Sequence, residues 1–250
     1  MRTLFILLRK ELKGYFQTPF GWVIIAAVAV ANGVGVSTAM KGFLVTPSQH
    51  SLIFATFHSP VFWFWFLFIF PLITMRTFAE EERTGTLETL LTAPVHTWQV
   101  VLSKYSAAFL FYATLWLPTM IQFHIFGWVT DLPNAWTPGE VVGTYTILLL
   151  MGLAFTAIGC MASAVTSSQI IAGLLTLCFL MILFFLGYVP VIWGGAFRGA
   201  DLFHYISCQE HLAFFAKGFL DTRPFVYYIS LAFLVIFITY QIVDYRRWKR

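Results

Sequence analysis

The sequence predicts an all-α protein that crosses a membrane six times, and three observations support this fold class. The 250 residues are 59% hydrophobic and only 10% charged. Their mean hydropathy is +0.80, a value that a water-soluble domain of this length could not tolerate on its surface. The apolar residues gather into six runs of about 20 residues, the length that an α-helix needs to cross a bilayer.

The six predicted spans leave no room for a soluble domain. The longest connecting piece, 194–224, is shorter than the roughly 40 residues that usually fold unaided. The whole chain, 1–250, is therefore interpreted as one membrane domain. The spans are predicted at 22–40, 53–75, 100–127, 141–165, 170–193 and 225–243.

Residues 1–18 are predicted to form an amphipathic helix that lies in the membrane interface. Its apolar residues share one half of the helix, with Arg9 and Lys10 opposite. Glu11 falls inside the apolar half, where a carboxylate needs a partner. We interpret Glu11 as a contact residue, the alternative being a side chain that reaches sideways to the headgroups. Pro19 then turns the chain into the first span.

The distribution of lysine and arginine orients the chain. Eleven of the 15 basic residues fall on one side of the predicted spans and four on the other. The eleven-residue side is predicted to be cytoplasmic, and both termini lie on it. The formal net charge of +4 follows from this bias, so no nucleic-acid partner is needed to explain it.

Small residues recur at helical spacing in two spans. Ala27, Ala31 and Gly35 form a smooth face in the first span, and Gly159 and Ser163 form one in the fourth. Such faces allow another helix to approach closely. They are a possible subunit interface, and packing within the chain is the alternative.

Two features of the middle spans are also informative. The aromatic run from Phe62 to Phe66 is interpreted as packing or lipid-facing, with a pathway for an amphipathic substrate as the alternative. Pro118 predicts a local break in the third span.

The outer loop, 194–224, is apolar enough to form short re-entrant helices. It also carries metal-capable side chains, which raises the alternatives of a metal site or an intramembrane enzyme. No paired ligand pattern of the zinc-site kind is present, so structural roles are favoured and no metal is expected. The side chains are Asp201, His204, Cys208, Glu210 and His211.

Residues 78–95 form a charged insert between two apolar runs, and this insert holds four of the eleven acidic residues. Glutamates near its start and Pro94 at its end predict a short cytoplasmic helix, which Gly85 weakens in the middle. Such a helix could fit a groove on a soluble partner, whereas a solvated loop is the alternative. The candidate contact residues are Glu80, Glu81, Glu82, Arg83, Thr84, Gly85, Thr86, Leu87, Glu88, Leu91, Thr92 and Pro94.

The sequence gives no sign of catalysis. No acidic or basic residue lies near the centre of a predicted span, which argues against a proton-coupled carrier. The phosphate-binding pattern GxxxxGK followed by Ser or Thr is also missing from the sequence. We therefore expect no enzyme activity, no cofactor and an energy source outside this chain.

The insert resembles the signature of a known family, the membrane permeases of type-2 ABC transporters, and most closely the branch associated with gliding motility. The resemblance is carried by Phe70-Pro71-Leu72 through Glu81, then by Arg83-Thr84-Gly85-Thr86-Leu87-Glu88 and Leu91-Thr92-Ala93-Pro94. It extends in pattern to Arg9-Lys10-Glu11, the turn at Pro19 and the order of six spans.

This resemblance implies the transmembrane subunit of an exporter in a bacterial or archaeal cytoplasmic membrane. Two permease subunits, identical or homologous, would pair and bind two copies of a separate ABC ATPase, which holds ATP and magnesium. The insert would be the coupling helix, with Arg9, Lys10 and Glu11 near the ATPase. The substrate stays open. The alternative is a non-transporting scaffold that transmits ATPase strokes to an envelope or gliding-motility machine.

Overall fold

The computed structural model describes residues 2–45, 51–86, 95–130, 136–192 and 200–248, and these residues contain helices and no strand. The helices are α1 (Arg2–Gln17), α2 (Pro19–Val45), α3 (Leu52–Phe57), α4 (Pro60–Thr74), α5 (Ala79–Thr84), α7 (Thr97–Thr114), α8 (Leu117–Thr130), α9 (Pro138–Val165), α10 (Gln169–Leu186), α11 (Val189–Ile192), α12 (Ala200–Ile206), α13 (Cys208–Ala216) and α14 (Arg223–Trp248).

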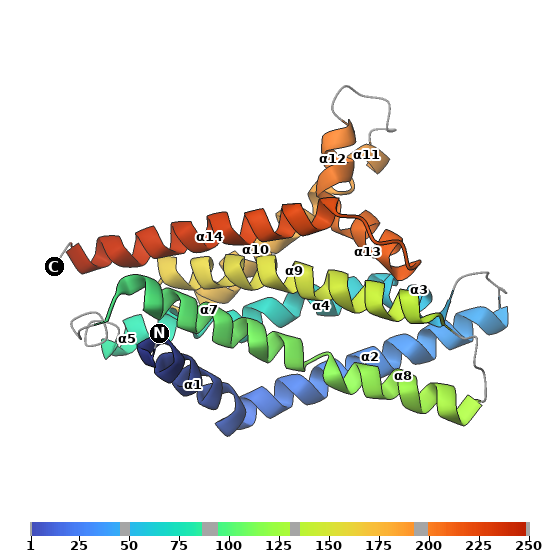
Figure 1. Cartoon of the computed structure of the whole chain (residues 1–250), viewed down its shortest axis with the longest axis horizontal. Coiled ribbons are helices and arrows are strands. Elements are labelled where there is room, and N and C mark those ends of the chain that lie inside the picture. Colours follow the sequence, from blue (N-terminus) through green and yellow to red (C-terminus); the bar gives the residue numbers. More distant parts are fainter. Residues whose placement is uncertain (1, 46–50, 87–94, 131–135, 193–199, 249–250) are drawn as a thin grey trace.

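Six helical stretches among the described residues are long and apolar enough to cross a membrane, which confirms the predicted fold class. Figure 1 shows the long helices aligned along one axis. Both termini and α5 lie at one end, which we call the termini end, and α3 and α13 lie toward the other. The six stretches are Pro19–Phe43, Pro60–Thr84, Thr97–Val129, Pro138–Val165, Gln169–Leu186 and Arg223–Arg246.

Helix α9 is the centre of the bundle. It contacts α4, α7, α10, α13 and α14, and most of its residues are buried. By contrast, less than a third of the residues in the membrane-spanning stretches of α2, α10 and α14 are buried. In a protein that crosses a membrane, these apolar faces contact lipid, because apolar side chains are stable in hydrocarbon and unfavourable in water.

Aromatic side chains fill the space between α4, α7 and α9. Phe62, Phe66 and Phe70 recur every four residues and so share one face of α4, and all three are buried. The Phe70 ring stacks on Tyr112, with centroids 5.1 Å apart, and meets Phe155 edge to face at 5.2 Å. Phe62 and Phe66, the first and last residues of the predicted aromatic run, are therefore core packing.

The predicted second span, 53–75, is wrong at its start, because the chain breaks before Pro60. Helix α3 ends at Phe57, and α4 begins at Pro60. Proline has no amide hydrogen and disfavours helical backbone in the residue before it. Ser59 then caps α4 by accepting a hydrogen bond from Phe62 N at 3.2 Å.

Two further breaks shape the bundle. The break expected at Pro118 is present, since α7 ends at Thr114 and α8 begins at Leu117. The fifth span was predicted to run to Trp193, but α10 ends at Leu186. At that point Gly187 packs against Ser207, close enough that a β-carbon there would lie 2.9 Å from the serine hydroxyl oxygen.

The outer segment forms the short helices α12 and α13. Helix α13 packs on α9 and α3 and buries Leu212 and Phe215 completely. This burial explains why the segment is apolar although it connects two spans.

Candidate functional site

The insert begins with a helix, α5, that is fastened to α9 through Ser163. The first residues of a helix have backbone N–H groups without partners inside the helix. Here the Ser163 hydroxyl accepts hydrogen bonds from Phe78 N and Ala79 N, both at 3.1 Å, and donates to Met75 O at 3.3 Å. Because Phe78, Ala79 and Ser163 are buried, the start of the insert is fixed against the central helix.

A lysine inside the bundle joins the insert to two other helices. Lys104 of α7 is 2% exposed, and its ammonium lies 2.8 Å from Glu81 of α5 and 3.2 Å from Glu11 of α1. Lys10 adds a weaker contact to Glu81 at 3.9 Å. A buried ammonium is stable only when it is paired and hydrogen-bonded. The two glutamates therefore hold α1, α5 and α7 together around one charge.

A second ion pair joins the insert to the C-terminal helix. Arg246 of α14 lies 2.7 Å from Glu82 of α5. The same guanidinium donates a hydrogen bond to Val165 O at 3.1 Å, at the end of α9. Thr97 donates to Asp244 at 2.9 Å and so ties α14 to the start of α7. We call Glu11, Glu81, Glu82, Lys104 and Arg246 the ionic cluster.

The rest of the described insert faces outward. Glu80 pairs with Arg83 within α5, at 2.9 Å, and Arg83, Thr84, Gly85 and Thr86 are exposed. Gly85 ends α5 with φ +73°, a left-handed conformation that favours glycine. The predicted single helix over 78–95 is therefore corrected, because its first part stops at Thr84.

The remaining predicted contact residues of the insert, Leu87, Glu88, Leu91, Thr92 and Pro94, lie outside the described residues. On α1, Arg9 and Lys10 are exposed, whereas Glu11 is partly buried. Tyr15 fastens α1 by donating a hydrogen bond to Ile73 O at 3.0 Å.

The small residues that were predicted as a possible subunit interface lie in different surroundings. Ala27 is exposed, whereas Ala31 and Gly35 lie against a cavity between α2 and α4. Gly159 and Ser163 are enclosed by their own chain, and a β-carbon on Gly159 would lie 2.1 Å from the Thr74 hydroxyl oxygen. The last two are therefore corrected to packing residues within the chain, because a second subunit could not reach them.

The metal-capable side chains of the outer segment do not converge. Within the described residues there is no group of three or more potential metal ligands. His204 pairs with Glu210, whereas His211 Nδ1 lies 3.1 Å from the Tyr228 hydroxyl. Burial raises the pKa of the Cys208 thiol to about 11, so the thiol is protonated at neutral pH and is a poor nucleophile. In the described residues, the two histidines therefore have partners within the chain.

Lys104 and Arg246 are the site residues that the sequence analysis missed. A signal for the first was present in the chain. Glu11 breaks the apolar half of its helix, and Lys104 is a lone cation close to the start of an apolar run. Because Glu11 and Lys104 carry opposite charges in apolar surroundings, each is a possible ion-pair partner for the other. The structure shows this ion pair.

Comparison with known proteins agrees with this architecture. A family model described as "ABC-2 family transporter protein" matches residues 23–238. A search of curated proteins finds no match. The matched region runs from the first span to the last and includes α5 with its contacts on α7 and α9. The chain therefore belongs to the ABC-2 transporter family and is a membrane permease component of an ABC transporter.

Proposed function

We propose that this chain is the permease subunit of an exporter and that the insert beginning at α5 receives the stroke of a separate ATPase. One observation carries the proposal: the ionic cluster and Ser163 connect α5 to α1, α7, α9 and α14. A force on α5 is therefore applied to four helices at once.

The chemistry of the exposed residues supports a protein partner at α5. The segment from Arg83 to Thr86 presents a charge, two hydroxyls and a glycine outside the bundle. Charged and polar groups of this kind direct association and register more than they add affinity. The chain has no GxxxxGK pattern of its own, so the energy comes from a partner that binds ATP and magnesium.

The proposed assembly has two permease chains and two ATPase subunits in a cytoplasmic membrane. The termini end is the cytoplasmic end in this proposal, because basic residues gather at α5, where Lys10, Arg83 and Arg246 pair with its glutamates. The second permease is either an identical or a homologous chain. A symmetric pair would place two copies of α5 under the bilayer, one for each ATPase.

The test is purification with a mild detergent from membranes of the source organism, followed by mass spectrometry. We expect an ABC ATPase in equal amount to the permease. Glu80→Lys combined with Arg83→Glu reverses the exposed pair of α5, so this variant should lose most of the bound ATPase. A matched variant at the opposite end, Asp221→Lys with Arg223→Glu, should keep it. Recovery of the permease without any ATPase would overturn the proposal.

Experiments on the same complex can distinguish export from a scaffold role. The resemblance to the gliding-motility-associated branch would support the scaffold role. ATP-dependent movement of a lipid, glycan or lipophilic compound in reconstituted vesicles indicates export. ATP hydrolysis without movement of any of them indicates the scaffold.

A further inference from the structure

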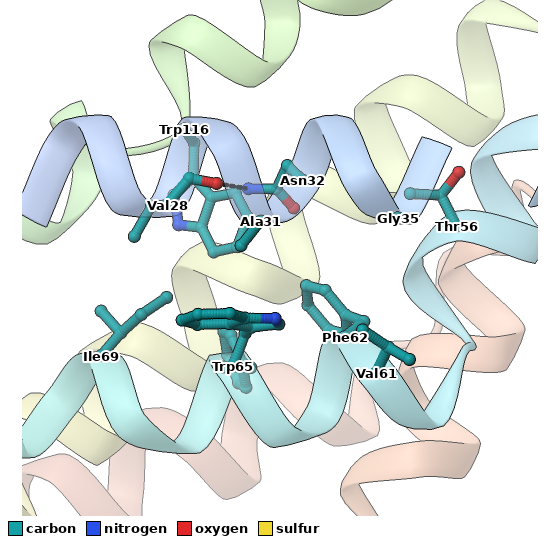
Figure 2. Close-up of a pocket in the computed structure, with 11 residues that line it drawn as sticks. Val28, Ala31, Asn32, Gly35, Thr56, Val61, Phe62, Trp65, Ile69 and Trp116 are labelled. Carbon is teal, nitrogen blue, oxygen red and sulfur yellow. Dashed lines mark hydrogen bonds between the residues drawn. The ribbon is translucent and has the colours of Figure 1, made fainter. Parts of the chain in front are cut away.

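A groove on α14 offers more room than the narrow space between α2 and α4. The aromatic rings of Trp65 and Trp116 leave that narrow space with room for roughly one water molecule (Figure 2). The groove on α14 has a volume of about 470 Å³ and is open to the outside. Because most of the membrane-spanning stretch of α14 is not buried within the bundle, the groove faces lipid.

Two rows of side chains on α14 form this groove. Side chains four residues apart make ridges along a helix, and the space between two ridges is a groove. From its first lining residue to its last, the helix rises about 13 Å, close to the roughly 15 Å of hydrocarbon in one leaflet of a bilayer. The groove therefore has the depth of one leaflet. Its ridges are Phe237, Gln241 and Tyr245 on one side, and Ile238, Ile242 and Arg246 on the other.

The chemistry of the groove changes along its length. Phe237 and Ile238 supply an apolar end, and both are more than a third exposed. The exposed amide of Gln241 follows, and the guanidinium of Arg246 lies last, toward the termini end. A phospholipid presents matching groups in the same order, which are an acyl chain, ester carbonyls that accept hydrogen bonds, and a phosphate. The groove therefore fits a phospholipid in one orientation.

Arg246 can bind a phosphate while it keeps its contacts in the ionic cluster. A guanidinium has five N–H donors, and Arg246 uses Nη1 for Glu82 and Nη2 for Val165 O. Its side chain is 26% exposed, so donors remain accessible from outside. The last ten residues of the chain include four basic residues and one acidic residue, Asp244. Basic residues clustered beside a membrane span attract anionic lipids, by about 1 kcal/mol each.

We propose that this groove binds an anionic phospholipid, with an acyl chain between the two ridges and the phosphate on Arg246. A second copy of the chain is a poorer occupant, because a symmetric contact between two α14 helices would bring their basic ends together. Binding requires no ATPase. The inference rests on the proposed function only where it assigns the lipid to the cytoplasmic leaflet.

A phosphatidylglycerol that carries a photoreactive diazirine on one acyl chain is a suitable probe. The purified chain would be irradiated in phosphatidylcholine vesicles that contain a small fraction of this lipid, and the labelled residues mapped by mass spectrometry. We expect label at Phe237, Ile238 and Ile242. Unlabelled phosphatidylglycerol should compete, whereas additional phosphatidylcholine or inorganic phosphate should not.

Two pairs of variants test the charge at the groove. Arg246→Gln should reduce labelling about fivefold, a change of about 1 kcal/mol, whereas Lys13→Gln, at an exposed lysine of α1, should leave it unchanged. Glu82 shares the Arg246 guanidinium with the phosphate, so Glu82→Gln should raise labelling about threefold. Glu80→Gln removes an acid from the same helix, outside the groove, and should have no effect. A purely structural function of Arg246 predicts no gain in Glu82→Gln.

A third pair tests the apolar end. Phe237→Ala combined with Ile238→Ala removes apolar contact area, so label at Ile242 should fall about threefold. Phe179→Ala combined with Ile182→Ala makes comparable changes at exposed positions of α10 and should leave that label unchanged. All four side chains face away from the core, so the fold should persist in both variants.

Label spread evenly over α2, α10 and α14, or equal competition by phosphatidylcholine and phosphatidylglycerol, would overturn the inference. Efficient disulfide formation between chains that carry Phe237→Cys, with Cys178 replaced by serine, would also overturn it, because a second copy would then occupy the groove. These failures are distinct from failure of the proposed function, which is measured by copurification of an ATPase.

Discussion

At the scale of single residues, the ionic cluster depends on Lys104, because one buried ammonium serves two carboxylates on different helices. Replacing it by methionine keeps the volume but leaves Glu11 and Glu81 with only the long contact from exposed Lys10. Both carboxylates are partly exposed, so water will relieve part of the cost. We expect Lys104→Met to lower the stability by about 1–3 kcal/mol, measured as a lower apparent melting temperature in detergent.

Lys10→Met is the matched control, because that lysine is 64% exposed and its contact to Glu81 is long. Exposed pairs of this kind contribute about 0–1 kcal/mol. A Lys104→Met variant that melts with the wild type would show that the buried contacts do not hold the insert.

His211 predicts a pH dependence at the opposite end of the molecule. Burial lowers the pKa of its imidazole to about 4 from the ordinary value of 6.5. The unfolded chain therefore binds a proton at a higher pH than the folded chain does. The stability that neutral His211 provides is complete above about pH 6.5 and is lost as the pH falls toward 4, by on the order of 2–3 kcal/mol.

Thermal melting between pH 7 and pH 4 would test this dependence, with His211→Asn as the comparison. The asparagine variant keeps the neighbouring carboxylates of Asp221 and Glu210. Its stability should fall less steeply than that of the wild type. If the melting temperatures of the two proteins fell equally with pH, His211 would not be the source of the acid sensitivity.

At the scale of elements, the attachment of α5 shows how a short helix can be held firmly. Its N-cap residue, Phe78, offers no side-chain oxygen, so the hydroxyl of Ser163 on α9 replaces the cap. We expect Ser163→Ala to leave two buried N–H groups unpaired and to cost about 1–3 kcal/mol, seen in the melting temperature. Ser168→Ala is the control, since that serine begins α10 without a side-chain capping bond and should change stability little.

The helices were predictable from the sequence to different degrees. The long apolar runs predicted all six spans, because the length and the hydropathy of a span can be read from its own residues. The sequence analysis did not predict the helix breaks at Pro60 and Gly187. A proline or a glycine interrupts a membrane helix only when neighbouring groups cannot satisfy the backbone hydrogen bonds that it frees. The functions of Ser163 and Arg246 were not predictable, because their partners lie about 80 or more residues away along the chain and pairing at that distance follows from the fold.

At the scale of the whole molecule, the termini end combines the fixed and the exposed parts of the insert. The ionic cluster holds α5 against the bundle, and the residues from Arg83 to Thr86 are exposed. The opposite end contains the short helices α3 and α13, which rest on the central α9. A displacement of α5 can therefore reach the far end through α9 and α14, which run from the termini end toward α13 in Figure 1.

A charge exchange between Glu82 and Arg246 tests this transmission. Nitroxide labels at Val129 and Phe219, both exposed near the far end, would be attached after exposed Cys178 is replaced by serine. In the complex with its ATPase, the distance between the labels should change by a few ångströms between the nucleotide-free and the vanadate-trapped states.

Glu82→Arg or Arg246→Glu places like charges together and should abolish most of this change. The double exchange restores opposite charges and should recover it, whereas Asp221→Lys, outside the ionic cluster, should leave it intact. Single variants that still transmit the full change would show that the pair is not part of the mechanical connection, because a lost contact that transmits force must reduce the movement it transmits.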